Sequence, residues 1–279
     1  EGDVGGAAET LLGLGMSREV QVWNKKVELS LGKLALLAQG GGSDDEAGKG
    51  EVGGTIKKID AELEVVKVQD LLYQWSLASV HEAVDSSAEV ELAVKQFGGL
   101  IPRRQKALLQ IFEDGIARLL KHEVLDPLTL IDLLTLSSLG PGHYEGMGDQ
   151  FFLALKVAHY AALENAEEVR RLIWRRCLIR DDWRQVNETN LKGDEEALEA
   201  VGETAAYRTL FACFDEGKNQ LFPLLPPNNN NNNKLSPLPF TLPYTGPNVV
   251  NRIINPHVPP SPYPQTVGLS WRLHRARTT

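Results

Sequence analysis

Histidines are the side chains in this chain best suited to bind a metal or to move a proton, and there are six of them. His81 is followed by Glu82, but residue 85 is not a second histidine, so the His-Glu-x-x-His spacing of zinc proteases is absent. His122 and His159 each stand alone in helix-like stretches, whereas a metal site needs converging ligands. We interpret these histidines as surface or structural residues and predict no metal.

A glycine-rich stretch over residues 140–148 superficially suggests a phosphate-binding loop. It lacks the Gly-Lys-Ser/Thr ending of such loops, and no strand precedes it. Serine, threonine and cysteine residues have no recognisable nucleophile elbow or triad context. Cys177 and Cys213 are too few for a disulfide framework or a four-ligand zinc site, so we expect reduced, buried thiols. The sequence therefore predicts no cofactor and no enzyme.

An arginine-rich cluster lies in residues 170–183. Positive charge is favoured near the C-terminal end of a helix, and two following aspartates can end the helix and pair with the arginines. We interpret this segment as a helix end that is fastened to the next segment, not as a binding site. Its predicted members are Trp174, Arg176, Arg180, Asp181, Asp182 and Trp183.

The charge of the chain is distributed unevenly. Residues 1–222 hold 24 Lys/Arg against 37 Asp/Glu, whereas residues 223–279 hold five basic residues and no acidic ones. Phosphate repels an acidic body, so we expect no direct binding of nucleic acid there. No run of 18 apolar residues exists, which predicts no membrane span. The chain starts without Met or a signal-peptide pattern, and we expect a fragment or an incomplete gene product.

The elements that position these residues are helices, because apolar residues recur at steps of three and four and alternation of period two is short-lived. Helices are predicted over residues 7–14, 17–38, 55–84, 88–97, 106–121, 126–136, 149–164, 166–179, 194–201 and 203–214. Helices joined by short loops predict an all-α fold, an irregular helical stack of the α-solenoid kind.

Composition divides the chain at residue 222. Residues 1–222 are predicted to form the scaffold domain, with a flexible, Gly- and acid-rich loop over residues 40–54. Residues 223–279 hold twelve of the fifteen prolines and a run of six asparagines. Proline at this density excludes helices and central strands, so this segment is predicted to be a disordered tail or sequence read through an unspliced boundary.

Three segments in order resemble one family. Residues 173–183 are similar to a segment near the C-terminal end of the 133-kDa scaffold nucleoporins. Residues 8–14 resemble the leucine-glycine-leucine entry of the same region, and residues 25–37 resemble the leucine-rich helix that follows this entry. Residues 207–214 lie where the family has its next helix. The resemblance covers about residues 7–217, and the low-complexity insertions lead us to expect a fungal-type member. It implies an α-helical C-terminal region at the nuclear pore of the nuclear envelope, which supports nucleocytoplasmic transport of protein and mRNA.

The resemblance also implies a partner. In this family the C-terminal region joins the C-terminal region of the 107-kDa nucleoporin (84-kDa in yeast) in the stem of the Y-complex, and touches the other Y-complex nucleoporins indirectly. The contact surface lies on early helices, here residues 18–37. The residues we expect at that interface are Trp23, Val27, Leu31 and Leu34. The same stripe could instead face the domain's own core. The alternative function is a helical adaptor of a vesicle coat or proteasome-type assembly.

Overall fold

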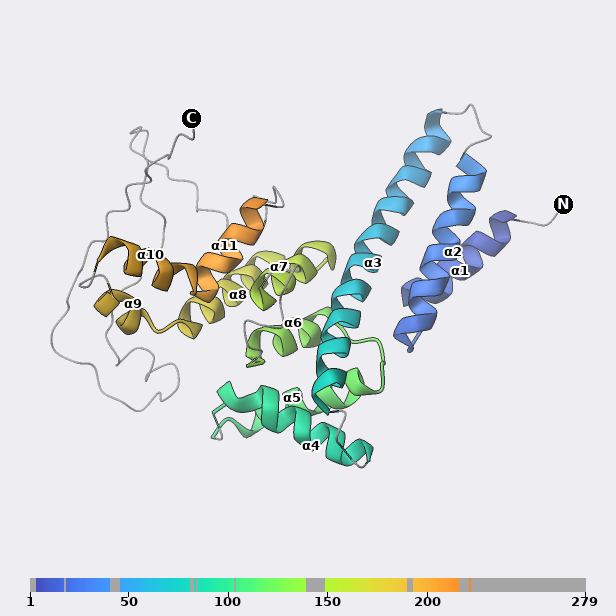
Figure 1. Cartoon of the computed structure of the whole chain (residues 1–279). Helices are drawn as coiled ribbons and strands as arrows, with labels where there is room; N and C mark the ends of the chain where they lie inside the picture. The colour runs from blue at the N-terminus through green and yellow to red at the C-terminus, as the bar shows by residue number, and fades with distance from the viewer. Residues whose placement is uncertain are drawn as a thin grey trace, which may run out of the picture. The chain divides into compact units, whose positions relative to one another are not determined.

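Eleven α-helices and one short 3-10 helix make up the described part of the chain in the computed structural model (Figure 1). The structure describes residues 4–17, 19–40, 46–80, 83, 85–102, 104–138, 149–189, 193–215 and 221. Within these ranges the one extended pairing is an isolated antiparallel bridge between Gln21 and Glu123. The predicted all-α helical stack is confirmed for this part.

The chain divides into two units, Glu1–Pro223 and Leu224–Thr279, and every described residue belongs to the first. The predicted disordered tail over residues 223–279 lies outside the described residues.

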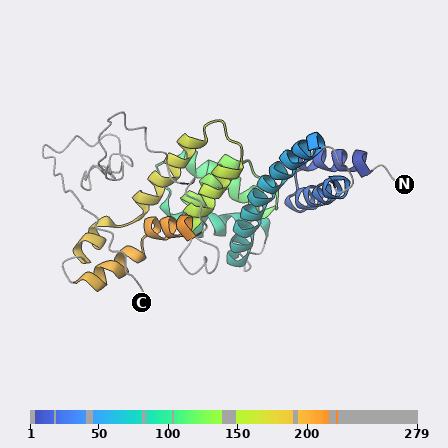
Figure 2. The same cartoon turned by 90° about the horizontal axis from the view of Figure 1, so that it is seen from above.

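Helices that follow one another in sequence mostly pack against one another. The last helix departs from this order and returns to pack on α7 and α8 (Figure 2). The elements are α1 (Val4–Ser17), α2 (Val22–Gly40), α3 (Glu46–Val80), α4 (Ser86–Phe97), η1 (Gly98–Leu100), α5 (Lys106–Leu120), α6 (Pro127–Leu136), α7 (Gln150–Tyr160), α8 (Ala166–Arg180), α9 (Trp183–Thr189), α10 (Asp194–Gly202) and α11 (Ala205–Asp215).

The main apolar core gathers side chains from the C-terminal half of α3 through α11. α7 lies at its centre, because apolar residues on every side of this helix are buried. Gly115 of α5 permits close packing on α6, since a Cβ atom there would lie 3.1 Å from side-chain carbons of Thr129 and Leu133. The largest buried side chains in this core include Phe112, Phe151, Phe152, Leu130 and Leu134.

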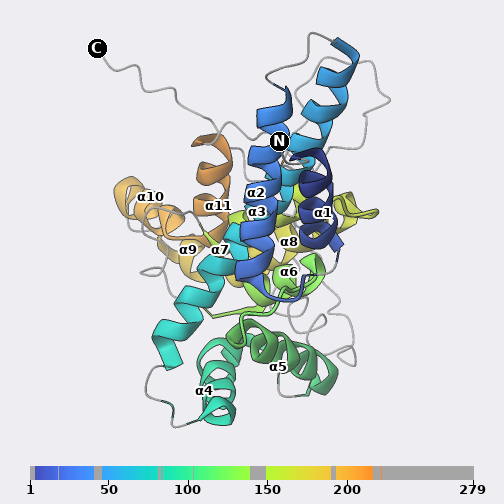
Figure 3. The same cartoon turned by 90° about the vertical axis from the view of Figure 1, so that its right-hand side faces the viewer.

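Five further buried apolar residues do not belong to the main core. They are Ala8, Val22, Leu29, Ile59 and Val66. They come from α1, α2 and residues 59–66 of α3, which we call the N-terminal lobe (Figure 3). The two helices of its α1–α2 pair approach closely at Gly32, where a Cβ atom would lie only 2.7 Å from the side chain of Leu12.

Two predicted boundaries at the lobe are wrong. The loop predicted over residues 40–54 is wrong for residues 46–54, which form the first turns of α3. Extending an existing helix adds one hydrogen bond per residue, and this gain offsets a glycine cost of about 1 kcal/mol per residue. The helix predicted over residues 17–38 starts at Val22, so Ser17 does not belong to it. Ser17 instead ends α1, where its hydroxyl donates to the carbonyl of Gly13 at 2.8 Å.

The two cysteines are buried thiols, as expected from their apolar surroundings. The Cys177 Sγ atom lies 3.6 Å from the Thr209 hydroxyl, and burial raises the pKa of the Cys177 thiol well above its usual range.

Because both thiols are buried, we expect neither cysteine of the native chain to react with a thiol reagent such as DTNB at pH 8. The chain unfolded in guanidinium should release two equivalents of thionitrobenzoate. Rapid reaction of the native chain would contradict this packing.

Candidate protein-interaction site

Helix α2 has a buried face and an exposed apolar face. Val22 and Leu29 point into the lobe and are fully buried. On the other face Trp23 is 64% exposed, Leu34 is 62% exposed and Leu31 is 48% exposed. Val27, between them, is half-buried. We call Trp23, Val27, Leu31 and Leu34 the α2 stripe.

Ion pairs fix which face of α2 points outward. Three lysines of α2 reach carboxylates of α3, with nitrogen–oxygen distances of 2.8, 2.7 and 2.5 Å. These pairs are Lys25–Glu62, Lys26–Asp70 and Lys33–Asp60. Turning the α2 stripe toward α3 would break all three pairs and would expose Val22 and Leu29. Of the two roles that the sequence left open, a part in the domain's own core is therefore wrong for the exposed members of the stripe in the described structure.

The predicted helix-end cluster joins α8 to several other segments. Trp174 is buried, and its indole Nε1 donates to the carbonyl of Leu221 at 3.2 Å. α8 ends at Arg180, as expected, and the indole Nε1 of Trp183 donates back to the carbonyl of Leu178 at 2.6 Å. Both tryptophans thus tie the chain after α8 to the helix itself.

The two aspartates of the cluster bind backbone amides. The Asp181 carboxylate accepts from the amides of Ala205 at 2.7 Å and Ala206 at 3.0 Å, at the start of α11. The Asp182 carboxylate accepts from the amides of Arg184 and Gln185 in the first turn of α9. Burial raises the pKa of Asp181, and these amide bonds oppose that rise.

The predicted pairing of Arg176 with the following aspartates is wrong. The Arg176 guanidinium lies 2.5 Å from the Asp132 carboxylate and 2.7 Å from the Thr135 hydroxyl, both on α6. Residues three or four apart are neighbours on a helix, whereas residues 181 and 182 follow Arg176 by five and six positions. Arg180 donates to the Ser137 carbonyl at 3.1 Å, so both arginines hold α8 on the end of α6.

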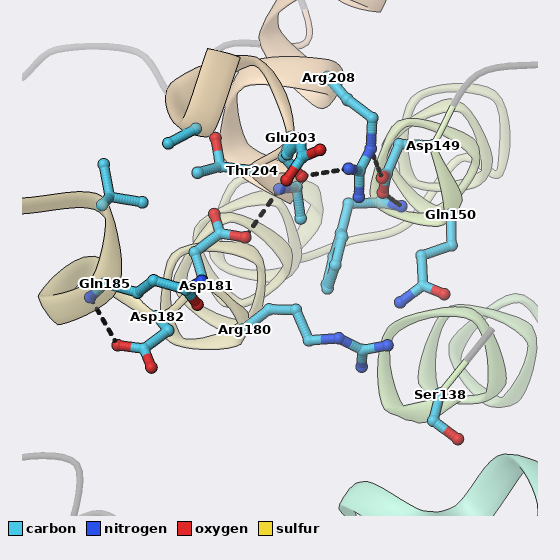
Figure 4. A pocket seen from close by; sticks show the side chains of 14 residues that line it. Ser138, Asp149, Gln150, Arg180, Asp181, Asp182, Gln185, Glu203, Thr204 and Arg208 are labelled. Atoms are coloured by element: carbon cyan, nitrogen blue, oxygen red, sulfur yellow. Dashed lines mark hydrogen bonds and ion pairs between the residues drawn. The ribbon is translucent and has the colours of Figure 1, made fainter. Parts of the chain in front are cut away.

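A polar pocket of about 430 Å³ lies beside this cluster (Figure 4). Its charged walls already serve as structural contacts. Arg208 pairs with the buried Asp149 at 3.1 Å, and Asp149 also accepts from the Phe151 amide at the start of α7. Its lining comes from α7 to α11, and Asp181 is engaged with α11, so we interpret the pocket as the place where these helices meet. No group of metal-ligating side chains was found among the described residues.

None of the described helices has both the length and the hydropathy that a membrane span requires.

The comparisons with known proteins agree on one family. The family model described as non-repetitive/WGA-negative nucleoporin C-terminal matches residues 1–242. Nucleoporin NUP133 of Chaetomium thermophilum is 99% identical over 216 residues, which cover 77% of this chain and 16% of that protein. Nucleoporin nup132 of Schizosaccharomyces pombe is 25% identical over 221 residues, covering 76% of this chain and 18% of that protein. No solved structure matches the chain.

The chain thus spans less than a fifth of the length of either relative. The match covers most of the chain, including the α2 stripe, and it confirms the resemblance seen in the sequence. It also decides against an adaptor of a vesicle coat or proteasome-type assembly. The chain belongs to the non-repetitive/WGA-negative nucleoporin C-terminal family, whose members are structural proteins of the nuclear pore complex at the nuclear envelope and not enzymes.

Proposed function

We propose that this chain binds the C-terminal region of the 107-kDa-type nucleoporin (84-kDa in yeast) through the α2 stripe, as a structural piece of the Y-complex stem. The observation that carries the proposal is the exposure of Trp23, Leu31 and Leu34 on a helix whose opposite face is buried. The partner comes from the resemblance to the 133-kDa scaffold nucleoporins.

The chemistry of the stripe suits a helix-on-helix interface. Interface cores are depleted in charged residues and are commonly anchored by tryptophan. The four stripe residues are all apolar, and the lysines of the same helix are engaged on the opposite side with α3. Steps of four, four and three residues place the stripe along one side of α2, as an antiparallel or crossing partner helix would require.

A double substitution tests this proposal. We expect Trp23→Glu combined with Val27→Glu to abolish co-elution with the partner region in gel filtration, because two carboxylates would be buried without counterions. Circular dichroism should show the helical content of the parent chain.

Ile111→Glu is the matched control, because Ile111 is an exposed apolar residue of α5 outside the stripe. This control should co-elute like the parent chain. Co-elution of the double variant at the parent level would remove the α2 stripe from the interface.

A further inference from the structure

The N-terminal lobe meets the rest of the domain at a small polar contact that neither the family match nor the proposed interface explains. The backbone between α1 and α2 pairs with the backbone that follows α5. The Val22 amide donates to the His122 carbonyl at 3.1 Å, and the Val124 amide donates to the Val20 carbonyl at 2.6 Å. These bonds flank the Gln21–Glu123 bridge. Two stretches about a hundred residues apart in sequence are therefore joined directly.

A buried glutamine of helix α3, Gln69, binds the backbone of the segment after α5. The Gln69 side-chain amide donates to the Glu123 carbonyl at 2.6 Å, and its oxygen accepts from the Leu125 amide at 3.1 Å. Gln69 is only 2% exposed. Gln69 thus bonds the backbone at both Glu123 and Leu125 and fixes the segment after α5 on α3. Breaking either bond would leave a buried polar group without its partner, which costs free energy.

His122 links the same three segments through its ring. Its Nε2 atom lies 2.8 Å from one oxygen of the Asp70 carboxylate, and the other oxygen of Asp70 lies 2.7 Å from the Lys26 ammonium of α2. The ring stacks on Tyr73 with a centroid distance of 4.2 Å. Asp70 therefore connects the segment after α5 with α2 itself.

The backbone of His122 supplies an independent observation. Its φ angle is 56°, in the left-handed region that residues other than glycine rarely occupy. Such a conformation persists only where the surroundings hold it. Here the ring contacts with Asp70 and Tyr73, together with the two backbone pairings, supply that hold.

We propose that His122, Asp70, Lys26 and Gln69 form a clasp that fixes the direction in which the α2 stripe points. The α1–α2 pair buries Ala8, Val22 and Leu29 outside the main core and packs on α3, so without the clasp it can tilt about α3 while remaining folded. Val20 lies just before the start of α2 and near the stripe; it is 59% exposed, and its carbonyl accepts from the Val124 amide. The clasp thus fixes the position of the N-terminal end of α2, where the α2 stripe begins. Its effect on partner binding rests on the proposed function.

The direction of α2 can be measured without the partner. Spin labels would be placed through Ala38→Cys on α2 and Lys106→Cys on α5, both exposed positions, in the full chain. The native cysteines are buried. We expect His122→Gly, which permits the positive φ and removes the ring, to broaden the distance distribution measured by double electron–electron resonance while circular dichroism stays unchanged. Asp70→Ala should broaden it as well, and it keeps the test open if the glycine variant unfolds.

Gln110→Ala is the matched control, because it removes a side-chain hydrogen bond to Asp114 on α5 outside the clasp. It should leave the distance distribution unchanged. Affinity for the 107-kDa-type C-terminal region should fall about tenfold in the clasp variants and stay at the parent value in the control. Unchanged distance distributions in both clasp variants would overturn the clasp. Broadened distributions with parent-level affinity would overturn its role at the interface. If the parent chain fails to bind, the proposed function fails and the distances alone decide the clasp.

Discussion

Replacing Trp23 by alanine is expected to weaken binding of the 107-kDa-type C-terminal region about 100-fold. Trp23 is the most exposed member of the α2 stripe, and a tryptophan that becomes buried at the centre of an interface contributes about 2–4 kcal/mol by alanine substitution. A loss near 2.7 kcal/mol corresponds to about 100-fold in the dissociation constant. The free chain should keep its melting temperature, because the exposed indole contributes little to the packing inside the lobe.

Isothermal titration calorimetry would measure the Trp23→Ala affinity, and differential scanning calorimetry the stability of the free chain. Leu172→Ala provides the control, because Leu172 is an exposed apolar residue of α8 outside the stripe. It should bind like the parent chain. A loss of stability in Trp23→Ala that matches its loss of affinity would show that Trp23 acts within the fold and not at the interface.

Replacing Trp174 by alanine is expected to lower the free energy of unfolding by about 3–5 kcal/mol, as large buried aromatic side chains do when truncated. Trp174 is 3% exposed, lies in the main core and holds the Leu221 carbonyl through its indole nitrogen. Its loss leaves a cavity in the main core and deprives the buried Leu221 carbonyl of this donor. Urea denaturation followed by circular dichroism measures the change.

Trp174→Phe separates the two contributions at this site. Phenylalanine retains most of the apolar volume and removes the hydrogen bond to Leu221, so it should cost clearly less than alanine, about 1–3 kcal/mol. Equal losses in the two variants would show that the hydrogen bond, and not the packing of the ring, dominates the contribution of Trp174.

The α2 stripe shows what periodicity can and cannot predict. Steps of three and four residues placed Trp23, Val27, Leu31 and Leu34 on one face of a helix, and the structure has them there. Periodicity does not say whether that face points toward the core. The answer depends on Lys25 and Lys33 finding Glu62 and Asp60 on another helix, a pairing between residues far apart in sequence.

The clasp could not be predicted from the sequence for the same reason, because its residues are far apart along the chain. His122 was interpreted from the sequence as a histidine alone in a helix, and the structure places it just past the end of α5 with a positive φ. Its partners Asp70 and Tyr73 lie some fifty residues earlier in the chain. The one local signal was the break in apolar periodicity after α5, which marks a turn but not what the turn contacts.

Helix α3 joins the N-terminal lobe to the main core mechanically. It is 35 residues long, which at 1.5 Å per residue gives a rod of about 50 Å. Ile59 and Val66 of α3 belong to the lobe, whereas Leu72 and Val80, nearer its C-terminal end, belong to the main core. A pull exerted on α2 therefore reaches the main core along the covalent backbone and the hydrogen-bond ladder of one rod, and the stiffness of that rod decides how far the pull displaces the rest of the domain.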